Sequence, residues 1–168
     1  MTARRPTVKR IGTRKLALRN KLWPDLDEGQ IWIRTKSKGF TTVPRSMTCI
    51  LQIMDKLSPG KPLGSTYFTL WCHVFDECFV VINNPRLMAF EAGFRGQRSE
   101  STWKVRMKKL LELGFIDAKE GGGGPFTNIL IYNPYLVIRE LKDSGQKLPE
   151  DIYNFLIQKM SDIGADDF

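Results

Sequence analysis

The sequence has no long hydrophobic run and few cysteines. Apolar runs such as Phe79 to Ile82 are only a few residues long, whereas a membrane-spanning helix needs about 20 apolar residues. There is no secretory hydrophobic segment near the first residues, and the three cysteines are an odd number among apolar neighbours. These features predict a cytoplasmic protein that is kept reduced and does not enter a membrane.

Histidine is nearly absent as well, and its scarcity argues against several enzyme classes. A single histidine, His73, cannot supply a two-histidine metal motif. Cys72 and Cys78 lack the C-x2-C spacing of a zinc site, and we identify no fourth ligand. The stretch SPGKPLGST resembles a phosphate-binding loop, but its first glycine is missing and Pro62 stands where Ser or Thr should bind magnesium.

Nucleophilic chemistry has equally little support. No serine or cysteine lies in a motif typical of a histidine-based triad. Tyr132 and Tyr135 are candidate strand-transfer nucleophiles in type only, since no histidine cluster accompanies them to hold a metal. We therefore predict a protein that is not an enzyme, with no catalytic residue, cofactor, metal or small-molecule ligand.

Acidic residues are missing from the first 21 positions, which hold eight basic ones, and the rest of the chain has 18 of each sign. Charge is uneven there too: residues 95–109 carry six basic groups and one acid, while residues 140–168 carry three basic and seven acidic groups. Separate positive patches indicate an anionic partner, which can be nucleic acid, anionic lipid or an acidic protein. An arginine-rich leader is also typical of a mitochondrial transit peptide, but Pro6, Gly12 and the lack of serine disfavour that interpretation.

The apolar pattern predicts an α+β fold with three regions. Residues 1–21 are expected to form a disordered basic arm. Residues 22–144 are expected to form a winged-helix domain, which opens with a hairpin from Ile31 to Val43, and residues 145–168 a C-terminal helix and acidic tail. The predicted helices within and after this domain are 46–57, 67–77 with Ser65 or Thr66 as cap, 85–92 with Asn84 as cap, 99–113, and two more within 133–160. The predicted strands are 79–82, 115–118 and 127–132, the last two joined by a flexible Gly-rich loop.

The segment after Gly96 carries the functional prediction. Ser99 is the expected N-cap of a helix whose buried stripe consists of Trp103, Met107, Leu110 and Leu111. The opposite side is polar and basic. A helix, a tight turn, a basic helix and a hairpin, in that order, are typical of a helix-turn-helix whose second helix enters the major groove of DNA.

Each residue type on this outer side suits a contact with a duplex. Small polar side chains and lysines bind bases or phosphates, valine contacts a thymine methyl, and arginines in a turn bind phosphates. The predicted DNA-binding residues are Arg95, Arg98, Ser99, Ser101, Thr102, Lys104, Val105, Lys108, Lys109, the wing residue Lys119, and Arg4, Arg5 and Arg10 of the arm.

These residues also carry a resemblance to a known family. The stretch RSESTWKVRMKKLLELGFI is similar to the recognition helix of winged helix-turn-helix proteins, and the resemblance covers residues 84–132. The stretch TNILIYNPYLVI looks like the end of the winged-helix domain in some plasmid replication and copy-control proteins. The resemblance implies a double-stranded DNA partner, with transcriptional regulation or plasmid replication control as the task.

Three points stay open in the sequence. The protein can be a homodimer, because symmetric DNA sites favour one. A protein-interaction module that uses the arm as a tether is one alternative to DNA binding. An RNA-binding protein is another, although the strand-borne stacking aromatics typical of ribonucleoprotein domains are absent.

Overall fold

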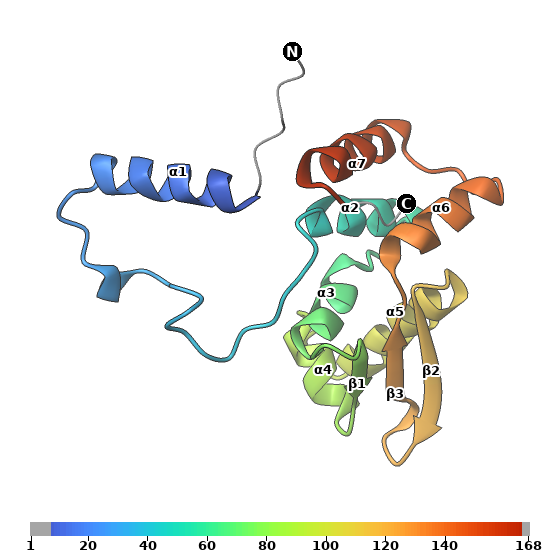
Figure 1. Cartoon of the computed structure of the whole chain (residues 1–168). Helices are drawn as coiled ribbons and strands as arrows, with labels where there is room; N and C mark the ends of the chain where they lie inside the picture. Colours follow the sequence, from blue (N-terminus) through green and yellow to red (C-terminus); the bar gives the residue numbers. More distant parts are fainter. Residues whose placement is uncertain (1–7, 166–168) are drawn as a thin grey trace. The chain divides into compact units, whose positions relative to one another are not determined.

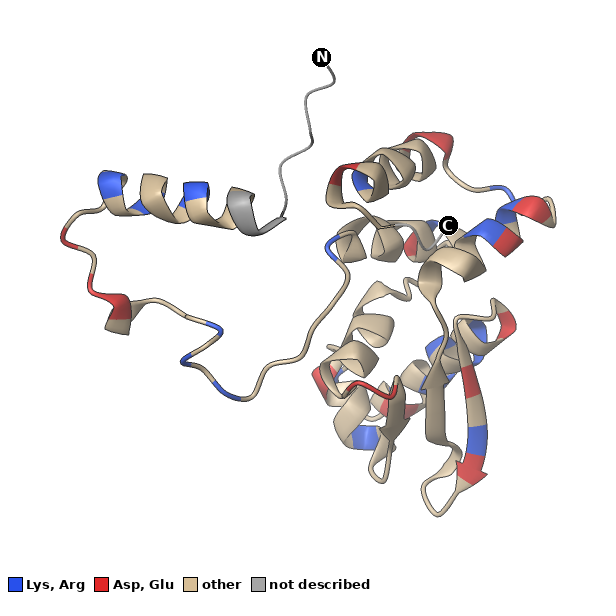
Figure 2. Cartoon of the chain, viewed as in Figure 1, with Lys and Arg blue, Asp and Glu red and all other residues tan. Residues whose placement is uncertain are grey.

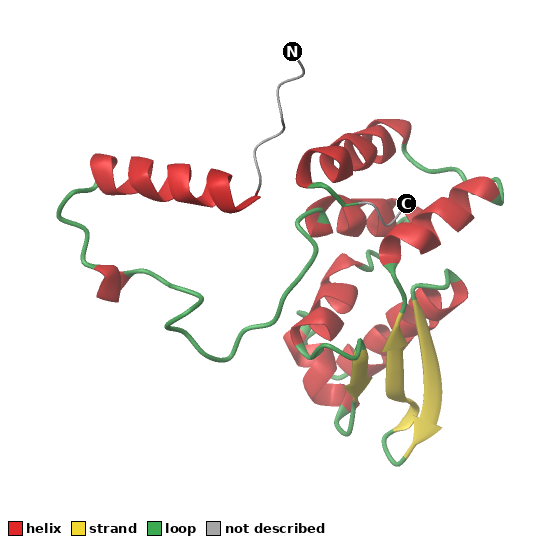
Figure 3. Cartoon of the chain, in the orientation of Figure 1, coloured by secondary structure: helices red, strands yellow, loops and turns green. Residues whose placement is uncertain are grey.

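The computed structural model describes residues 8–165, and the chain forms two compact units, Met1–Phe40 and Thr41–Phe168 (Figure 1). The structure therefore divides the chain differently from the boundaries predicted after residues 21 and 144. The described residues form a mixed α+β fold with seven α-helices and one three-stranded antiparallel sheet, which is compatible with a winged helix (Figure 3).

The first unit contains helix α1, Val8–Leu22, where the sequence predicts a disordered arm. Residues 1–7 lie outside the described residues. Leucine, alanine, lysine and arginine dominate the segment, and their high helix propensity outweighs the single Gly12. Arg19 and Lys21 in the last turn stabilise the helix, because their positive charges interact favourably with the negative end of the helix dipole.

The hairpin predicted from Ile31 to Val43 is absent from the described residues of this region. A short 3-10 helix, η1, spans Glu28–Gln30, and a helix-like turn follows in which the amides of Lys36 and Ser37 both donate to the Ile33 carbonyl at 2.9 Å. An isolated two-stranded hairpin is only marginally stable unless a third strand or a helix covers its apolar face, and the alternating pattern does not supply that cover. In its place Trp32 packs edge-on against Phe40, with ring centroids 5.6 Å apart.

The second unit contains all the strands that the structure describes. Its elements are α2 Met47–Leu57, α3 Gly64–Cys72, β1 Phe79–Val81, α4 Pro85–Glu91, α5 Ser99–Glu112, β2 Ile116–Gly121, β3 Gly124–Ile131, α6 Pro134–Asp143 and α7 Glu150–Ile163. The predicted asparagine cap of α4 is confirmed, since the Asn84 side chain accepts from the Leu87 amide at 3.1 Å. Asn133 caps α6 in the same way.

Strand β3 is the centre of the sheet, whose order is β1-β3-β2 with both pairings antiparallel. Phe79 and Asp117 both pair with Leu130, from the two neighbouring strands. One face of the sheet packs on the core, and Val80, Ile129 and Ile131 are buried there. The sheet thus closes one side of a core whose other side is helical.

The core extends from α2 to α7, so residues 145–165 belong to the same unit as the sheet. Helix α7 packs against α2 and buries Leu156 and Met160 (Figure 1). The Ser46 hydroxyl before α2 is buried and hydrogen-bonds to the Tyr135 hydroxyl of α6. The C-terminal helices therefore support α2 within the second unit.

Helix α3 begins and ends earlier than the sequence predicts. Ser65 and Thr66, the predicted caps, lie inside it. The Asp55 carboxylate of α2 instead accepts from the amides of Leu63 and Gly64, both at 2.7 Å. A carboxylate at a helix N-terminus accepts hydrogen bonds from amides that have no partner within the helix, and its charge interacts favourably with the positive end of the helix dipole. Asp55 therefore fixes the start of α3.

Replacing Asp55 by alanine tests this role. Asp55→Ala leaves the buried amides of Leu63 and Gly64 without their acceptor, and we expect a loss of about 1–3 kcal/mol of unfolding free energy. Urea unfolding measures the change, with Asp76→Ala, an exposed loop acid, as the control. Equal stabilities of the two variants would contradict the capping role.

Candidate nucleic-acid interface

Helix α5 is held by one buried side. Trp103, Met107 and Leu110 are completely buried, which confirms three of the four predicted stripe residues. Leu111 is 38% exposed, so its predicted burial is wrong. At about 100° per residue, Leu111 lies roughly 40° beyond Met107, outside the arc that the three buried residues define.

The outward side of α5 presents a short row of side chains. Ser101, Val105 and Lys108 are exposed and recur at spacings of four and three, which places them on one face of the helix. Thr102 is half-buried beside them. Lys108 has no hydrogen bond or ion pair with any described residue, so its ammonium group is available to an anion.

Two other predicted lysines are already engaged within the helix. Lys104 pairs with Glu100 at 2.6 Å, and Lys109 pairs with Glu112 at 3.5 Å. Both pairs are partly exposed, and such pairs contribute little to stability. A phosphate can therefore replace either carboxylate at low cost, but the carboxylates reduce the positive charge of the face.

The structure corrects the prediction for Ser99. Arg98, not Ser99, is the N-cap residue, and Ser99 is the first helical residue and is buried. Ser99 is only 8% exposed and lies on the Trp103 side of α5, away from Val105 and Lys108. The Ser101 hydroxyl donates to the Arg98 carbonyl at 2.9 Å and remains exposed as an acceptor.

The two arginines of the α4–α5 turn have different surroundings. Arg95 stacks on the Phe90 ring, 3.8 Å from its centroid, and donates to the carbonyls of Phe90 and Phe94 at 2.5 and 3.0 Å. These contacts give Arg95 a structural role in holding the turn. Arg98 is exposed, and its side chain makes no hydrogen bond or ion pair with the residues that the structure describes.

The β2–β3 hairpin, which corresponds to the predicted wing, is tighter than expected. Gly121 pairs with Gly124, so the four glycines form a short turn between strands and not a flexible loop. A Cβ at Gly121 would lie 2.7 Å from the Thr127 side chain, and one at Gly123 would lie 2.7 Å from the Ile82 carbonyl. Packing therefore requires glycine at both positions, a reason that the sequence did not reveal.

Lys119 projects from this hairpin with a side chain that is 78% exposed, and it pairs with Asp117 at 3.3 Å. The Ala118 amide, which donates to the Asp117 carboxylate, holds the pKa of Asp117 below its usual range, and Lys119 adds to this effect. Lys119 thus remains accessible to a phosphate, as predicted for a wing residue.

Two basic residues outside the predicted set connect α5 with the turn between α2 and α3. Arg106 donates to the Pro62 carbonyl at 3.1 Å, which ties α5 to the turn between α2 and α3. Lys61 of that turn lines a groove of about 540 Å³ with Val105, Lys108 and Lys109 of α5. Lys61 precedes Val105, the nearest groove residue of α5 in the sequence, by more than 40 positions, and no local pattern signals their approach.

The net charge is confined to the first unit. Residues 1–40 hold eleven basic and three acidic groups, whereas residues 41–168 hold fifteen of each. Figure 2 shows lysine and arginine along α1 with no acidic residue in that helix. Of the predicted arm residues, Arg4 and Arg5 lie outside the described residues, and Arg10 belongs to α1.

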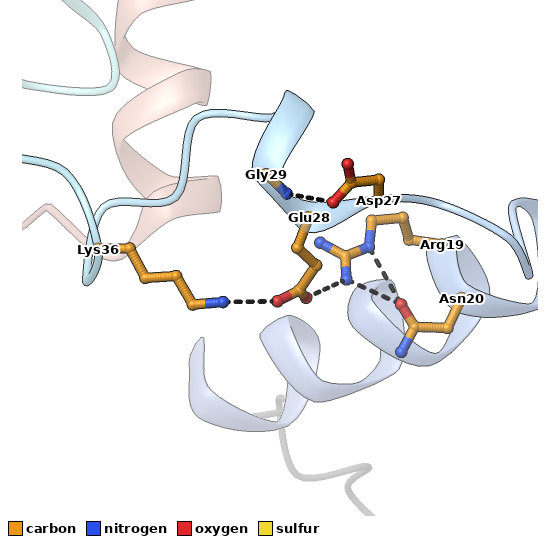
Figure 4. A network of polar contacts seen from close by, with 6 residues as sticks. All are labelled: Arg19, Asn20, Asp27, Glu28, Gly29 and Lys36. Carbon is orange, nitrogen blue, oxygen red and sulfur yellow. Dashed lines mark hydrogen bonds and ion pairs between the residues drawn. The ribbon is translucent and has the colours of Figure 1, made fainter.

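A network of charged side chains connects two parts of the first unit. Glu28 accepts from Lys36 at 2.9 Å and from Arg19 of α1 at 3.2 Å, and Arg19 also donates to Asn20 (Figure 4). Hydrogen bonds from Lys36 and then Arg19 hold the pKa of the Glu28 carboxyl below its usual range. This network links the end of α1 to the turn that follows η1.

The cysteine and histidine side chains are dispersed. Cys49 is buried. Cys72 is exposed as a residue, but partial burial of its thiol raises the pKa of that thiol, and the Glu91 carboxylate adds to this effect. His73 pairs with Glu91 at 2.5 Å. Within residues 8–165 no three potential metal ligands lie together.

Comparisons of the chain with protein-family models, curated proteins and solved structures gave no match. None of the described helices is long and apolar enough to cross a membrane.

Removing the Glu100 carboxylate tests whether Lys104 can bind an anion. Glu100→Gln frees the Lys104 ammonium, and we expect affinity for duplex DNA to rise by about two- to fivefold, in line with the small free energy of exposed pairs. Fluorescence anisotropy measures it, with Glu150→Gln, an acid in the first turn of α7, as the charge-matched control. An equal rise in both variants would show only a general effect of charge.

The Glu28 network predicts a pH dependence. Because the pKa of Glu28 is lowered in the folded unit, the stabilisation is fully present above the ordinary glutamate pKa and is lost as pH falls through the lowered value. NMR of the full chain during acid titration should show the amides at the end of α1 changing with the Glu28 carboxyl. Glu28→Gln should remove this transition and Asp25→Asn should retain it; a transition that survives in Glu28→Gln has another cause.

Proposed function

We propose that this chain binds double-stranded DNA through a winged helix-turn-helix domain and acts in transcriptional regulation or in the control of plasmid or mobile-element replication. The observation that carries the proposal is the orientation of α5. Its Trp103 side is buried and its Val105 and Lys108 side is exposed, and the tight β2–β3 hairpin follows α5 in the chain.

The order of the elements supports this proposal. From α3 to β3 the chain runs helix, strand, helix, helix, strand, strand, and β1 pairs with the far strand of the hairpin. In winged-helix proteins the third of these helices is the recognition helix and the hairpin after it is the wing. By this correspondence α5 reads DNA, and α4 with its Arg95-bearing turn holds α5 in place.

The proposed mechanism divides the contacts by their chemistry. A major groove about 12 Å wide accepts an α-helix, so Ser101, Val105 and Lys108 reach base edges or nearby phosphates. Arg98 and Lys119 bind the backbone on either side, and phosphate contacts of this kind set the register of the protein on DNA. The basic first unit adds affinity that does not depend on sequence and that falls steeply with salt.

One observation favours a second function, protein interaction. The outer face of the sheet exposes Phe79, Val81 and Leu130, and the register places Phe79 opposite Leu130. Adjacent exposed apolar side chains are a feature of protein-binding surfaces. This surface lies on the sheet and not on the outward side of α5, so it is compatible with DNA binding by α5.

Selection from random duplexes tests the proposed function. A recovered sequence motif supports direct readout, and its symmetry reports whether one or two copies bind. Equal binding of duplex and RNA would favour the RNA-binding alternative, and binding of neither would leave protein interaction.

A double substitution tests the role of α5 within that function. Lys104→Ala with Lys108→Ala should lower affinity for the selected duplex by about tenfold or more, since contacts of this kind contribute about 1–3 kcal/mol each. The charge-matched control is Lys147→Ala with Lys159→Ala, two lysines of the α6–α7 region that are not among the residues lining this face. If the α5 variant keeps full affinity while removal of residues 1–40 abolishes binding, α5 does not read DNA.

A further inference from the structure

A groove runs beside the outward face of α5. Its walls are the turn between α2 and α3, which contributes Leu57, Pro59 and Lys61, and α5, which contributes Val105, Lys108 and Lys109. Its volume is about 540 Å³. The groove therefore adjoins the side chains proposed to read DNA, although half of its wall comes from another part of the chain.

The wall opposite α5 is fixed in place. Gly60 has a φ of +73°, a left-handed conformation that follows proline in tight turns, and the Lys61 amide donates to the Ser58 carbonyl at 3.0 Å. Arg106 of α5 holds the Pro62 carbonyl at 3.1 Å. The turn is thus anchored to α5, and Lys61 is held near the groove without needing a ligand.

The groove combines positive charge with an apolar floor. Lys61 and Lys108 have no ion pair with any residue in the described part of the chain, and Lys109 is opposed by Glu112 at a distance of 3.5 Å. Leu57, Pro59 and Val105 supply the apolar surface. Three ammonium groups against one carboxylate select an anion, and the apolar floor suits a ligand with apolar parts between its charges.

The placement of the polar groups favours a strand over a small molecule. Small-ligand sites orient their ligand through a few precisely placed polar groups in an enclosed cavity. Here the charges are the ends of flexible lysine side chains on an open groove. Such ends suit repeated phosphates along a backbone, and deoxyribose rings between the phosphates match the apolar floor.

We propose that this groove holds a phosphodiester segment of the DNA strand next to the base pairs read by α5, with Lys61 as a phosphate-binding residue. This inference rests on the proposed function and adds the α2–α3 turn to the interface. It makes Lys61 and Lys108 bind the same strand from opposite walls.

The test compares Lys61→Ala with Lys147→Ala, an exposed lysine of the α6–α7 connection, on the full-length protein and a selected duplex. Affinity is measured by anisotropy over a range of salt concentrations. We expect Lys61→Ala to lower affinity severalfold for specific and unrelated duplexes alike and to reduce the salt dependence by about one released ion. Lys147→Ala should match the wild type in both quantities.

Ethylation interference on the same duplex locates the contact. In the wild type, a modified phosphate that faces the groove should weaken binding, and this effect should disappear in Lys61→Ala while the others remain. If wild-type protein binds the duplex and Lys61→Ala keeps its affinity, salt dependence and footprint, the inference is overturned and the proposed function stands. If wild-type protein binds no duplex, both are overturned.

Discussion

The burial of one side of α5 is the constraint on which the rest of the second unit depends. Trp103, Met107 and Leu110 have no exposed surface, and burying side chains of this size contributes several kcal/mol together. Rotation of the helix about its axis would expose them, so the same burial that stabilises the unit also determines which residues face outward. Val105 and Lys108 are exposed because the tryptophan side is not.

Contacts with neighbouring segments then hold α5 at its start and at its middle. Arg95, stacked on Phe90, fixes the turn before it, and Arg106 fixes its middle to the α2–α3 turn through Pro62. Asp55 holds the other end of that turn at the start of α3. Two of the basic residues near the proposed interface therefore serve mainly to position the others, which is why charge alone is a poor guide to the residues that bind an anion.

The sequence predicted local structure well where the signal was local. Asn84 and Asn133 before proline mark helix starts because one side chain suffices to cap an amide. It failed where the outcome depends on distant partners. The hairpin predicted after Ile31 would need a third strand or a helix to cover its apolar face, and α3 is capped by Asp55 from another helix.

The same distinction applies to the candidate site. The outward placement of Lys108 follows from helical periodicity, so the sequence predicted it. The groove does not follow from helical periodicity, because Lys61 lies beside α5 only through the packing of α2 and α3. The sequence predicts a flexible Gly-rich loop in the hairpin, but the need for glycine there, close packing against Thr127 and the Ile82 carbonyl, exists only in three dimensions.

The two units differ in net charge, and this difference gives them different roles in the proposed function. The second unit is neutral overall, so its attraction for a polyanion must come from the local arrangement around α5, which acts over a distance comparable to the Debye length of about 10 Å. The first unit carries the whole excess of eight positive charges, and attraction of that kind depends little on DNA sequence. Under the proposed function, the first unit would supply affinity and the second would supply discrimination between sequences, because a neutral unit is not held on every duplex by its own net charge.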